Sequence, residues 1–358
     1  MSMSAATHSS HLCLKRLLNE PRDNLLKWKR ARLVPPPPST SLSPCLGPTS
    51  PTPKDSPSQS PSRVGSYLLY GRSEREETFR AVHVHTKQQY TCQVLPLRCY
   101  QERLAAYAQI GNHDNVCGIL DVVIGEESVY VFLPNHHGDM HAYVRSRKRL
   151  GEEEAGLLFQ QMLNAVVHCH HHGVVLRDLK LRRFVFMDKF RTRVALLGLN
   201  DCVLLHGNHD DDSLSDRHGC PAYVGPELLT NGNTCYSGRA ADMWSLGVSL
   251  YTMLIGRYPF QDTQPAALFA KIRRGAYSLP EWLSPRAKCV IGCMLRKSPT
   301  ERLTGRELLM HPWLTSPRTH HHHATKTQHS HSSPAAPASF NQHDDSDDQV
   351  VPTWTENK

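Results

Sequence analysis

The 358-residue sequence lacks several features that would assign its class directly. No stretch approaches the roughly 18 consecutive apolar residues of a membrane-spanning helix. The N-terminus shows no apolar segment ahead of a cleavage site, so we expect no secretory signal. The eleven cysteines include no C-x-x-C pair, and their number is odd. This usage favours reduced thiols in the cytosol or nucleus over a disulfide framework.

Positive charge is in excess, with a formal net charge of +8, but it does not gather on a predicted folded face. It is densest in "KWKRARL", which lies in a segment rich in serine and proline. A nuclear localisation signal is the functional interpretation, and a solvated run of charge is the alternative. Because a nucleic-acid-binding face needs clustered charge, we do not expect direct DNA binding. The residues of the signal would be Lys27, Lys29, Arg30 and Arg32.

Composition divides the chain into four parts. Residues 1–64 are rich in serine and proline, which predicts disorder. Residues 65–315 have the hydrophobic patterning of one globular domain. Residues 316–343 are rich in histidine, serine and proline and predict a flexible linker, and residues 344–358 form an acidic tail.

Two strands and one helix are clear within the globular part. "FRAVHVH" and "QYTCQVL" alternate apolar and polar residues, which predicts strands. "GEEEAGLLFQQMLNAVVHCHHHG" predicts a helix whose first turn is acidic, as suits the helix dipole, and which stops at Gly173. An apolar stripe recurs along it at helical spacing, at Leu158, Met162, Val166 and Cys169.

The segment after this helix, "VVLRDLKLRRFVF", resembles the H-R-D-L-K-x-x-N catalytic loop of protein kinases. Asp178 stands at the catalytic base, and Arg177 and Lys180 also match. Leu176 replaces the histidine, and Arg183 replaces the asparagine that binds Mg²⁺. Two unit charges about 4 Å apart interact by roughly 4 kcal/mol at an effective dielectric of 20. A guanidinium facing a divalent ion would therefore oppose metal binding by about twice that.

The other parts that hold nucleotide are also altered. "YTCQV" places Gln93 where a kinase has the lysine that holds the phosphates. Of the glycine-rich loop only Gly71 remains, and glutamates follow it. The D-F-G position reads Leu196-Leu197-Gly198, or Gly198-Leu199-Asn200 with an insertion, and Asp201 is the first aspartate. We therefore expect no nucleotide, metal or cofactor, and we expect Arg177 and Asp178 to hold the loop together.

Residues that stabilise a kinase fold are present. "GPELL" places Glu227 at the A-P-E glutamate, and "KSPTERLT" supplies Arg302 as its ion-pair partner. Asp242 would accept hydrogen bonds from the catalytic-loop backbone. The sequence therefore predicts an α+β, protein-kinase-like bilobal fold, with a small β-rich N-lobe, a helical C-lobe and disordered tails.

The altered loop and several other segments resemble the Tribbles pseudokinases, namely "LRDLKLRRFVF", "HGDMHAYVRSRKRL", "HGCPAYVGPELL" and "GRYPFQDTQPAALFAKIRRGAY". "KRAR" and the "YTCQV" context are most similar to the third vertebrate paralogue, although Gln93 departs from the lysine usual in the family. The resemblance implies an adaptor and kinase inhibitor that is not an enzyme. The runner-up function is a weak, unconventional serine/threonine kinase that uses Asp178.

The resemblance implies two binding motifs. "HPWL" resembles the family's docking site for mitogen-activated protein kinase kinases, and packing of Trp313 within the domain is the alternative. The tail "DDSDDQVVPTW" resembles the binding motif for an E3 ubiquitin ligase of the constitutive-photomorphogenesis type, although Thr353 stands where the family often has an acidic residue. A solvated acidic tail is the alternative. The motifs comprise His311, Pro312, Trp313 and Leu314, and Asp347, Asp348, Gln349, Val351, Pro352 and Trp354.

Clients and location follow from the resemblance alone. It implies CCAAT/enhancer-binding or activating transcription factors as clients, inhibition of Akt or of the mitogen-activated kinase pathway, and presence in nucleus and cytoplasm. "LLHGNHDDDSLSDRHGC" is either a client surface or a mobile, solvated loop. The histidine runs that begin at His168 and His320 lack a closed ligand set, so we expect no metal there.

Overall fold

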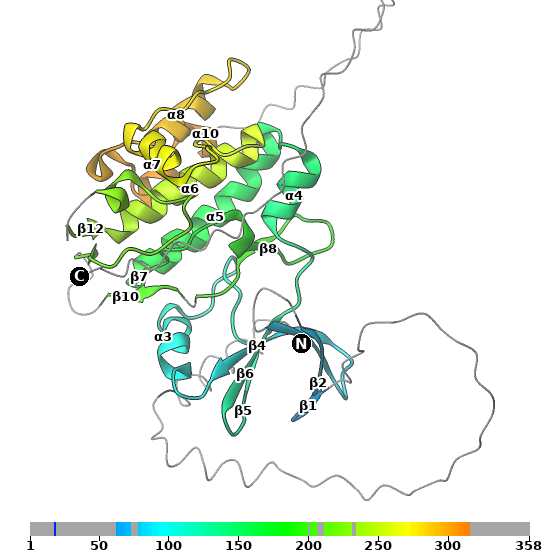
Figure 1. Cartoon of the computed structure of the whole chain (residues 1–358). Helices are drawn as coiled ribbons and strands as arrows, with labels where there is room; N and C mark the ends of the chain where they lie inside the picture. The colour runs from blue at the N-terminus through cyan, green and yellow to red at the C-terminus, as the bar shows by residue number, and fades with distance from the viewer. Residues whose placement is uncertain are drawn as a thin grey trace, which may run out of the picture. The chain divides into compact units, whose positions relative to one another are not determined.

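The computed structural model describes Leu18 and residues 62–72, 78–199, 201–205, 211–230 and 234–315 (Figure 1). The nuclear-localisation segment and the acidic tail lie outside these residues. The chain forms two compact units. Among the described residues, the first unit takes those within Met1–Ser146, Gln161–Leu176 and Leu181–Asp211, and the second takes those within Arg147–Gln160, Arg177–Lys180 and Asp212–Lys358.

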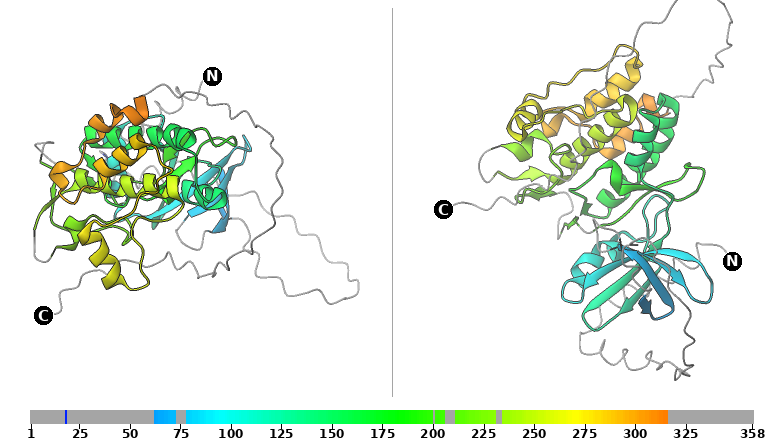
Figure 2. Two further views of the ribbon diagram at one scale, coloured as in Figure 1. Left: turned by 90° about the horizontal axis from the view of Figure 1, so that it is seen from above. Right: turned by 45° about the vertical axis from the view of Figure 1, so that its right-hand side comes forward.

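A six-stranded antiparallel sheet dominates the first unit, and its strands curve in the right-hand view of Figure 2. The strand order is β1-β2-β3-β4-β6-β5. Aromatic and aliphatic side chains from four neighbouring strands, β2, β3, β4 and β6, form one buried cluster, in which Tyr67 stacks on Phe132 at 3.7 Å. The strands are β1 (Ser62–Val64), β2 (Tyr67–Arg72), β3 (Thr78–His83), β4 (Gln89–Pro96), β5 (Asp121–Ile124) and β6 (Ser128–Pro134).

Helices and short strands complete this part of the chain. The predicted long helix is α5, and Gly173, with φ +68°, lies two residues beyond its end. Its four stripe residues are all buried, so burial of one apolar face explains the helix. The elements are α3 (Tyr100–Ile110), α4 (Met140–Arg147), α5 (Glu152–His171), β7 (Val174–Val175), η1 (Leu181–Arg183), β8 (Phe184–Phe186), β9 (Val194–Leu196) and β10 (Val203–Leu204).

The second unit is mainly helical and is built around α6, whose side chains are buried along most of its length. Hydroxyl side chains begin three of its helices, because each accepts a backbone N–H of the first turn: Ser237, Ser284 and Thr304. The elements are β11 (Ser213–Leu214), η2 (Pro226–Leu229), β12 (Tyr236–Ser237), α6 (Gly238–Ile255), α7 (Pro265–Arg274), α8 (Pro285–Met294), η3 (Pro299–Glu301), α9 (Gly305–Leu309) and α10 (Pro312–Thr315). Within the described residues, no helix combines the length and apolarity needed to cross a membrane.

Candidate functional site

In the second unit, Asp242 anchors the part of the catalytic-like loop that belongs there. Its Oδ1 accepts the backbone N–H of Arg177 at 2.8 Å, and its carboxylate is 1% exposed. Arg177 has a positive φ of 62°, and its guanidinium pairs with Asp216. A non-glycine residue pays for this backbone conformation, and the two aspartates hold it in place. These contacts fix the backbone and the side chain of Arg177, which is a structural role.

The carboxylate at the catalytic-base position is held by an ion pair. Lys180 Nζ lies 3.0 Å from Asp178 Oδ2, and the Asp178 side chain is only 10% exposed. A buried carboxylate needs a compensating partner, and Lys180 supplies it. The base that a kinase would need is therefore present and charge-compensated.

In the first unit, the cation at the metal-ligand position is itself paired. The guanidinium of Arg183, at the end of η1, forms an ion pair with Asp201. The Leu197 N–H donates to the Arg183 carbonyl at 2.7 Å. Gly198, with φ +80°, lets the chain pass close by, because a Cβ there would lie 3.1 Å from Arg183 Nη1. The first aspartate after β9 thus neutralises an arginine, and the sequence pattern does not predict this pairing.

The strand position of the phosphate-binding lysine carries a neutral amide. Gln93 lies within β4, opposite Thr78 on β3 and Val131 on β6. The only carboxylate of α3 is Glu102, which is exposed in the first turn. Tyr107 of α3 is buried beside Leu199, and burial raises the pKa of its phenol. Neither β4 nor α3 supplies its half of the lysine–glutamate pair that kinases use.

Other residues near the expected nucleotide site lie at a strand irregularity, in a turn or outside the described residues. Gly71 has φ +60° at a register shift between β2 and β3. Lys87 lies in the β3–β4 turn, and its N–H donates to the His83 carbonyl at 2.9 Å. The three glutamates after Gly71 and the residue Asn200 are not described.

A bidentate ion pair fastens two distant segments of the second unit. Arg302 Nη1 and Nη2 donate to the two carboxylate oxygens of Glu227, each at 2.6 Å. The Arg302 side chain is 1% exposed and also donates to the carbonyls of Ala240 and Arg296. Its guanidinium lies over the Trp244 ring, 4.9 Å from the centroid. Glu227 and Arg302 thus form an ion pair, and the buried guanidinium of Arg302 has acceptors for its N–H groups.

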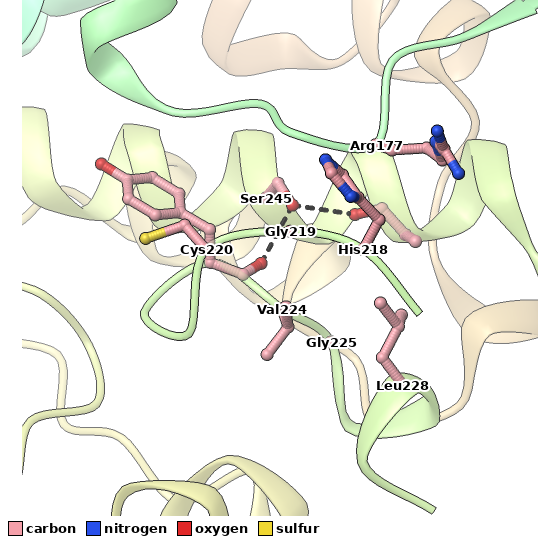
Figure 3. A pocket seen from close by; sticks show the side chains of 10 residues that line it. Arg177, His218, Gly219, Cys220, Val224, Gly225, Leu228 and Ser245 are labelled. Carbon is pink, nitrogen blue, oxygen red and sulfur yellow. Dashed lines mark hydrogen bonds between the residues drawn. The ribbon is translucent and has the colours of Figure 1, made fainter. Parts of the chain in front are cut away.

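A small depression lies beside the segment that would be an activation loop (Figure 3). Ser245 at its floor donates to the carbonyls of Tyr223 and Ala241, at 2.9 and 3.2 Å. The cavity volume is about 10 Å³, room for about one water molecule, so this depression cannot hold a nucleotide. Its lining is Arg177, His218, Gly219, Cys220, Tyr223, Val224, Gly225, Leu228, Ala241 and Ser245.

The "HPWL" segment is largely packed into the second unit. Trp313 and Leu314 are 9% and 5% exposed, and Trp313 Nε1 donates to Glu152 Oε2 at 3.2 Å. The His311 Nδ1 accepts the Trp313 backbone N–H at 3.2 Å, and burial lowers the His311 pKa. Pro312 alone of the four is exposed. Trp313 is therefore packed within the second unit. A docking partner would instead contact the exposed Pro312, and Met310, which lies just before the segment.

Comparison with known proteins agrees with this geometry. Residues 71–314 match the protein kinase domain family, so the chain carries a protein kinase domain. It is 54% identical to Tribbles homolog 2 of Bos taurus over 281 residues, which are 78% of this chain and 80% of the relative. Tribbles homolog 1 of Homo sapiens is 53% identical over 72% of this chain and 68% of its own length. Tribbles homolog 3 of Rattus norvegicus is 50% identical over 78% and 75%.

The chain belongs to the Tribbles family, so its kinase-like domain is a pseudokinase domain. The family prediction and the prediction of a β-rich N-lobe with a helical C-lobe are confirmed. Identities to the three paralogues differ by a few per cent and do not single out the third. The assignment to that paralogue stays a prediction.

Proposed function

We propose that this protein is a catalytically inactive adaptor and kinase inhibitor, which brings an E3 ubiquitin ligase to clients held by its folded domain. The proposal that the protein is catalytically inactive rests on the ion pair between Arg183 and Asp201. A Mg²⁺ ion needs oxygen ligands. Here the position of one ligand is a cation, and the first carboxylate after β9, Asp201, is already bound to that cation.

The positions at which a kinase would hold the phosphates of ATP support the same proposal. Gln93 brings no charge to the strand, and α3 offers only an exposed glutamate in its first turn. Phosphoryl transfer relies mainly on positioning and charge neutralisation. A base such as Asp178, already paired with Lys180, then has no held metal–nucleotide on which to act.

Ligase recruitment is assigned to the tail. Asp347 and Asp348 would meet a basic rim of the ligase, while Val351, Pro352 and Trp354 would enter an apolar pocket. Burying a valine or a larger apolar side chain yields about 1.5–3 kcal/mol, and micromolar affinity needs about 8 kcal/mol. The acidic residues and Gln349 would supply the difference, and Pro352 limits the entropy lost on docking.

The folded domain would hold the other partners. We assign client binding, to CCAAT/enhancer-binding or activating transcription factors, to the segment "LLHGNHDDDSLSDRHGC", residues 204–220. Docking of mitogen-activated protein kinase kinases would use the exposed edge of the "HPWL" segment, at Pro312 and Met310. Akt is a further candidate for inhibition. The basic segment at Lys27–Arg32 would bring the protein to the nucleus, with a second population in the cytoplasm.

The direct test is a pull-down from cell lysate, read by quantitative mass spectrometry. It compares the intact chain with the Val351→Ala/Pro352→Ala double variant. The ligase should bind the intact chain and be lost from the variant, while clients that bind the folded domain stay on both. If no ligase binds the intact chain, the recruitment role is wrong.

The runner-up function, a weak kinase, makes a different prediction. A ligand that binds the folded state raises its melting temperature by mass action. We expect no change in melting temperature at millimolar ATP, with or without Mg²⁺. A rise, together with autophosphorylation that disappears in Asp178→Asn, would favour the kinase instead.

A further inference from the structure

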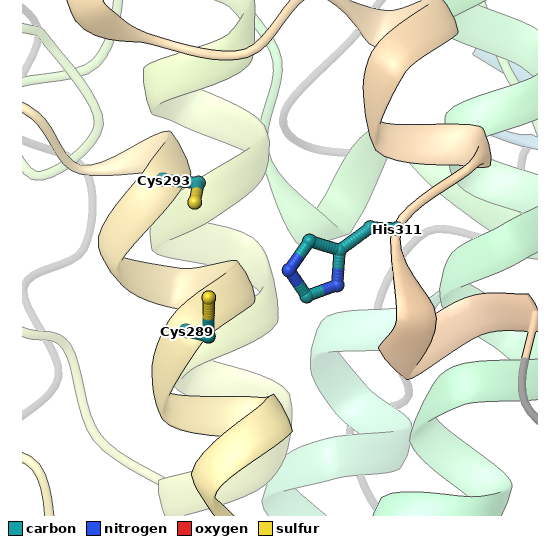
Figure 4. Close-up of side chains that lie close together, drawn as sticks. All are labelled: Cys289, Cys293 and His311. Carbon is teal, nitrogen blue, oxygen red and sulfur yellow. The ribbon is translucent and has the colours of Figure 1, made fainter.

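Two thiols and an imidazole meet in the second unit, and of these three residues only His311 belongs to a motif described above (Figure 4). Cys289 and Cys293 are four residues apart on α8, so their side chains lie on the same face of that helix. His311 comes from the turn between α9 and α10, and α8 contacts α10. The two sulfurs and a ring nitrogen all lie within 4.8 Å of one another.

We propose that Cys289, Cys293 and His311 form a Zn²⁺ site, with a water molecule as the fourth ligand. Tetrahedral zinc with Zn–S bonds of about 2.3 Å places two sulfurs about 3.8 Å apart. The observed spread of at most 4.8 Å thus needs a closure of about 1 Å or less, which side-chain rotation can supply. Two thiolates and one imidazole form a soft ligand set, which suits zinc better than Mg²⁺ or Ca²⁺.

The burial of the three residues suits this site. His311 is 9% exposed, Cys293 is half-buried and Cys289 is exposed, so the ion can enter from the Cys289 side, where water can complete the coordination. Burial lowers the pKa of His311, which keeps the imidazole in the neutral form that binds metals. Burial and the neighbouring Cys289 raise the pKa of Cys293, and a bound cation reverses that preference.

Metal binding at this site would act on the start of α10. Because His311 Nδ1 accepts the Trp313 N–H, the neutral ring carries its proton on Nε2, the nitrogen left for the ion. When the ion binds, that proton moves to Nδ1, and the Trp313 N–H loses its acceptor. The two thiols each lose a proton to solvent, so about two protons leave for each ion bound. The indole of Trp313 therefore reports on occupancy.

The test is a titration of the full-length, fully reduced protein with Co²⁺, which replaces zinc and is coloured. We expect one equivalent to give a sulfur-to-cobalt charge-transfer absorption that Zn²⁺ removes, together with a change in Trp313 fluorescence. The absorption requires a thiolate ligand, which the histidine run at His320 does not contain. The run at His168 contains Cys169, but this side chain is 0% exposed in the apolar stripe of α5, so we expect no absorption from that run either.

Matched cysteine variants decide the assignment. Cys293→Ser should abolish the absorption, and Cys289→Ser should weaken binding by more than the about 10–100-fold that loss of an outer-shell partner costs. Cys235→Ser, which removes an exposed cysteine outside the triad, should leave the titration unchanged. Thermal melts confirm folding, and Cys293→Ala replaces the serine variant if that one unfolds. No absorption in the reduced wild-type protein, or full absorption in the Cys289→Ser/Cys293→Ser double variant, would overturn the site. Neither result bears on the proposed adaptor function.

Discussion

Gly256, the C-terminal cap of α6, lies where the fold has no room for any side chain. Its φ is +82°, and a Cβ there would lie 1.9 Å from the Lys148 carbonyl oxygen. We expect Gly256→Ala to lower the free energy of unfolding by about 2–4 kcal/mol, from left-handed strain and overpacking together. Urea unfolding followed by circular dichroism measures this. Gly292→Ala is the matched control, since nothing lies within 4 Å of a Cβ there, and we expect it to be neutral or stabilising by up to about 1 kcal/mol.

The Glu227–Arg302 pair gives a second prediction about single side chains. Glu227→Gln keeps the shape but leaves a guanidinium that is 1% exposed without its counter-charge. We expect a loss of about 3–5 kcal/mol in the same unfolding measurement. Lys271→Met, which breaks an ion pair whose lysine is 45% exposed, should cost less than about 1 kcal/mol. Equal losses in the two variants would show that the carbonyl acceptors of Arg302 suffice to hold it.

Histidines at the C-terminal end of α5 make the stability of the first unit depend on pH. The His168 ring stacks at 4.3 Å on His113 and lies 4.3 Å from the His172 ring, and its Nε2 donates to the Ile110 carbonyl at 2.9 Å. Burial, and then the neighbouring His113, lower the pKa of His168 from 6.5 to about 4. Between these pH values the unfolded chain binds a proton that the folded chain does not. Stability from this group is therefore fully present above about pH 6.5 and is lost as the pH falls toward 4.

We expect the free energy of unfolding to fall by about 2 kcal/mol across that range because of His168, after allowance for its partial exposure. His168→Gln can still donate to the Ile110 carbonyl but does not titrate, so it should flatten the dependence. His85→Gln, at an exposed position of the β3–β4 turn, should leave the dependence as in the wild type. Unfolding curves at several pH values test this, and an unchanged slope in His168→Gln would contradict it.

The same helix shows what the sequence could predict and what it could not. The stripe of α5 and the strands β3 and β4 follow from local periodicity, which depends only on neighbours in the chain. The pairing of Arg183 with Asp201 depends on how the chain after β9 returns to η1, and no local pattern encodes that. No C-x-x-C spacing marks the triad of Cys289, Cys293 and His311. Its two cysteines are an i, i+4 pair on one face of α8, and His311 comes from another element, which no local pattern encodes.

For the molecule as a whole, the proposed function depends on one chain holding both a client and a ligase. Linking two binding modules makes the second binding event intramolecular and raises the effective concentration, often by about 10²–10⁴-fold in avidity. The test is to insert a specific protease site into the predicted linker, between residues 316 and 343. Ubiquitin transfer to a client identified in the pull-down is then measured before and after cleavage.

Cleavage should reduce transfer by about 100-fold or more, while each fragment keeps its own partner, because no contact within either module has changed. The uncleaved chain with the inserted site controls for the insertion, and Val351→Ala/Pro352→Ala sets the floor that corresponds to an unrecruited ligase. Transfer that continues at the original rate after cleavage would mean that client and ligase do not need to be held by one chain. The folded domain would then act by inhibiting kinases directly, independently of the tail.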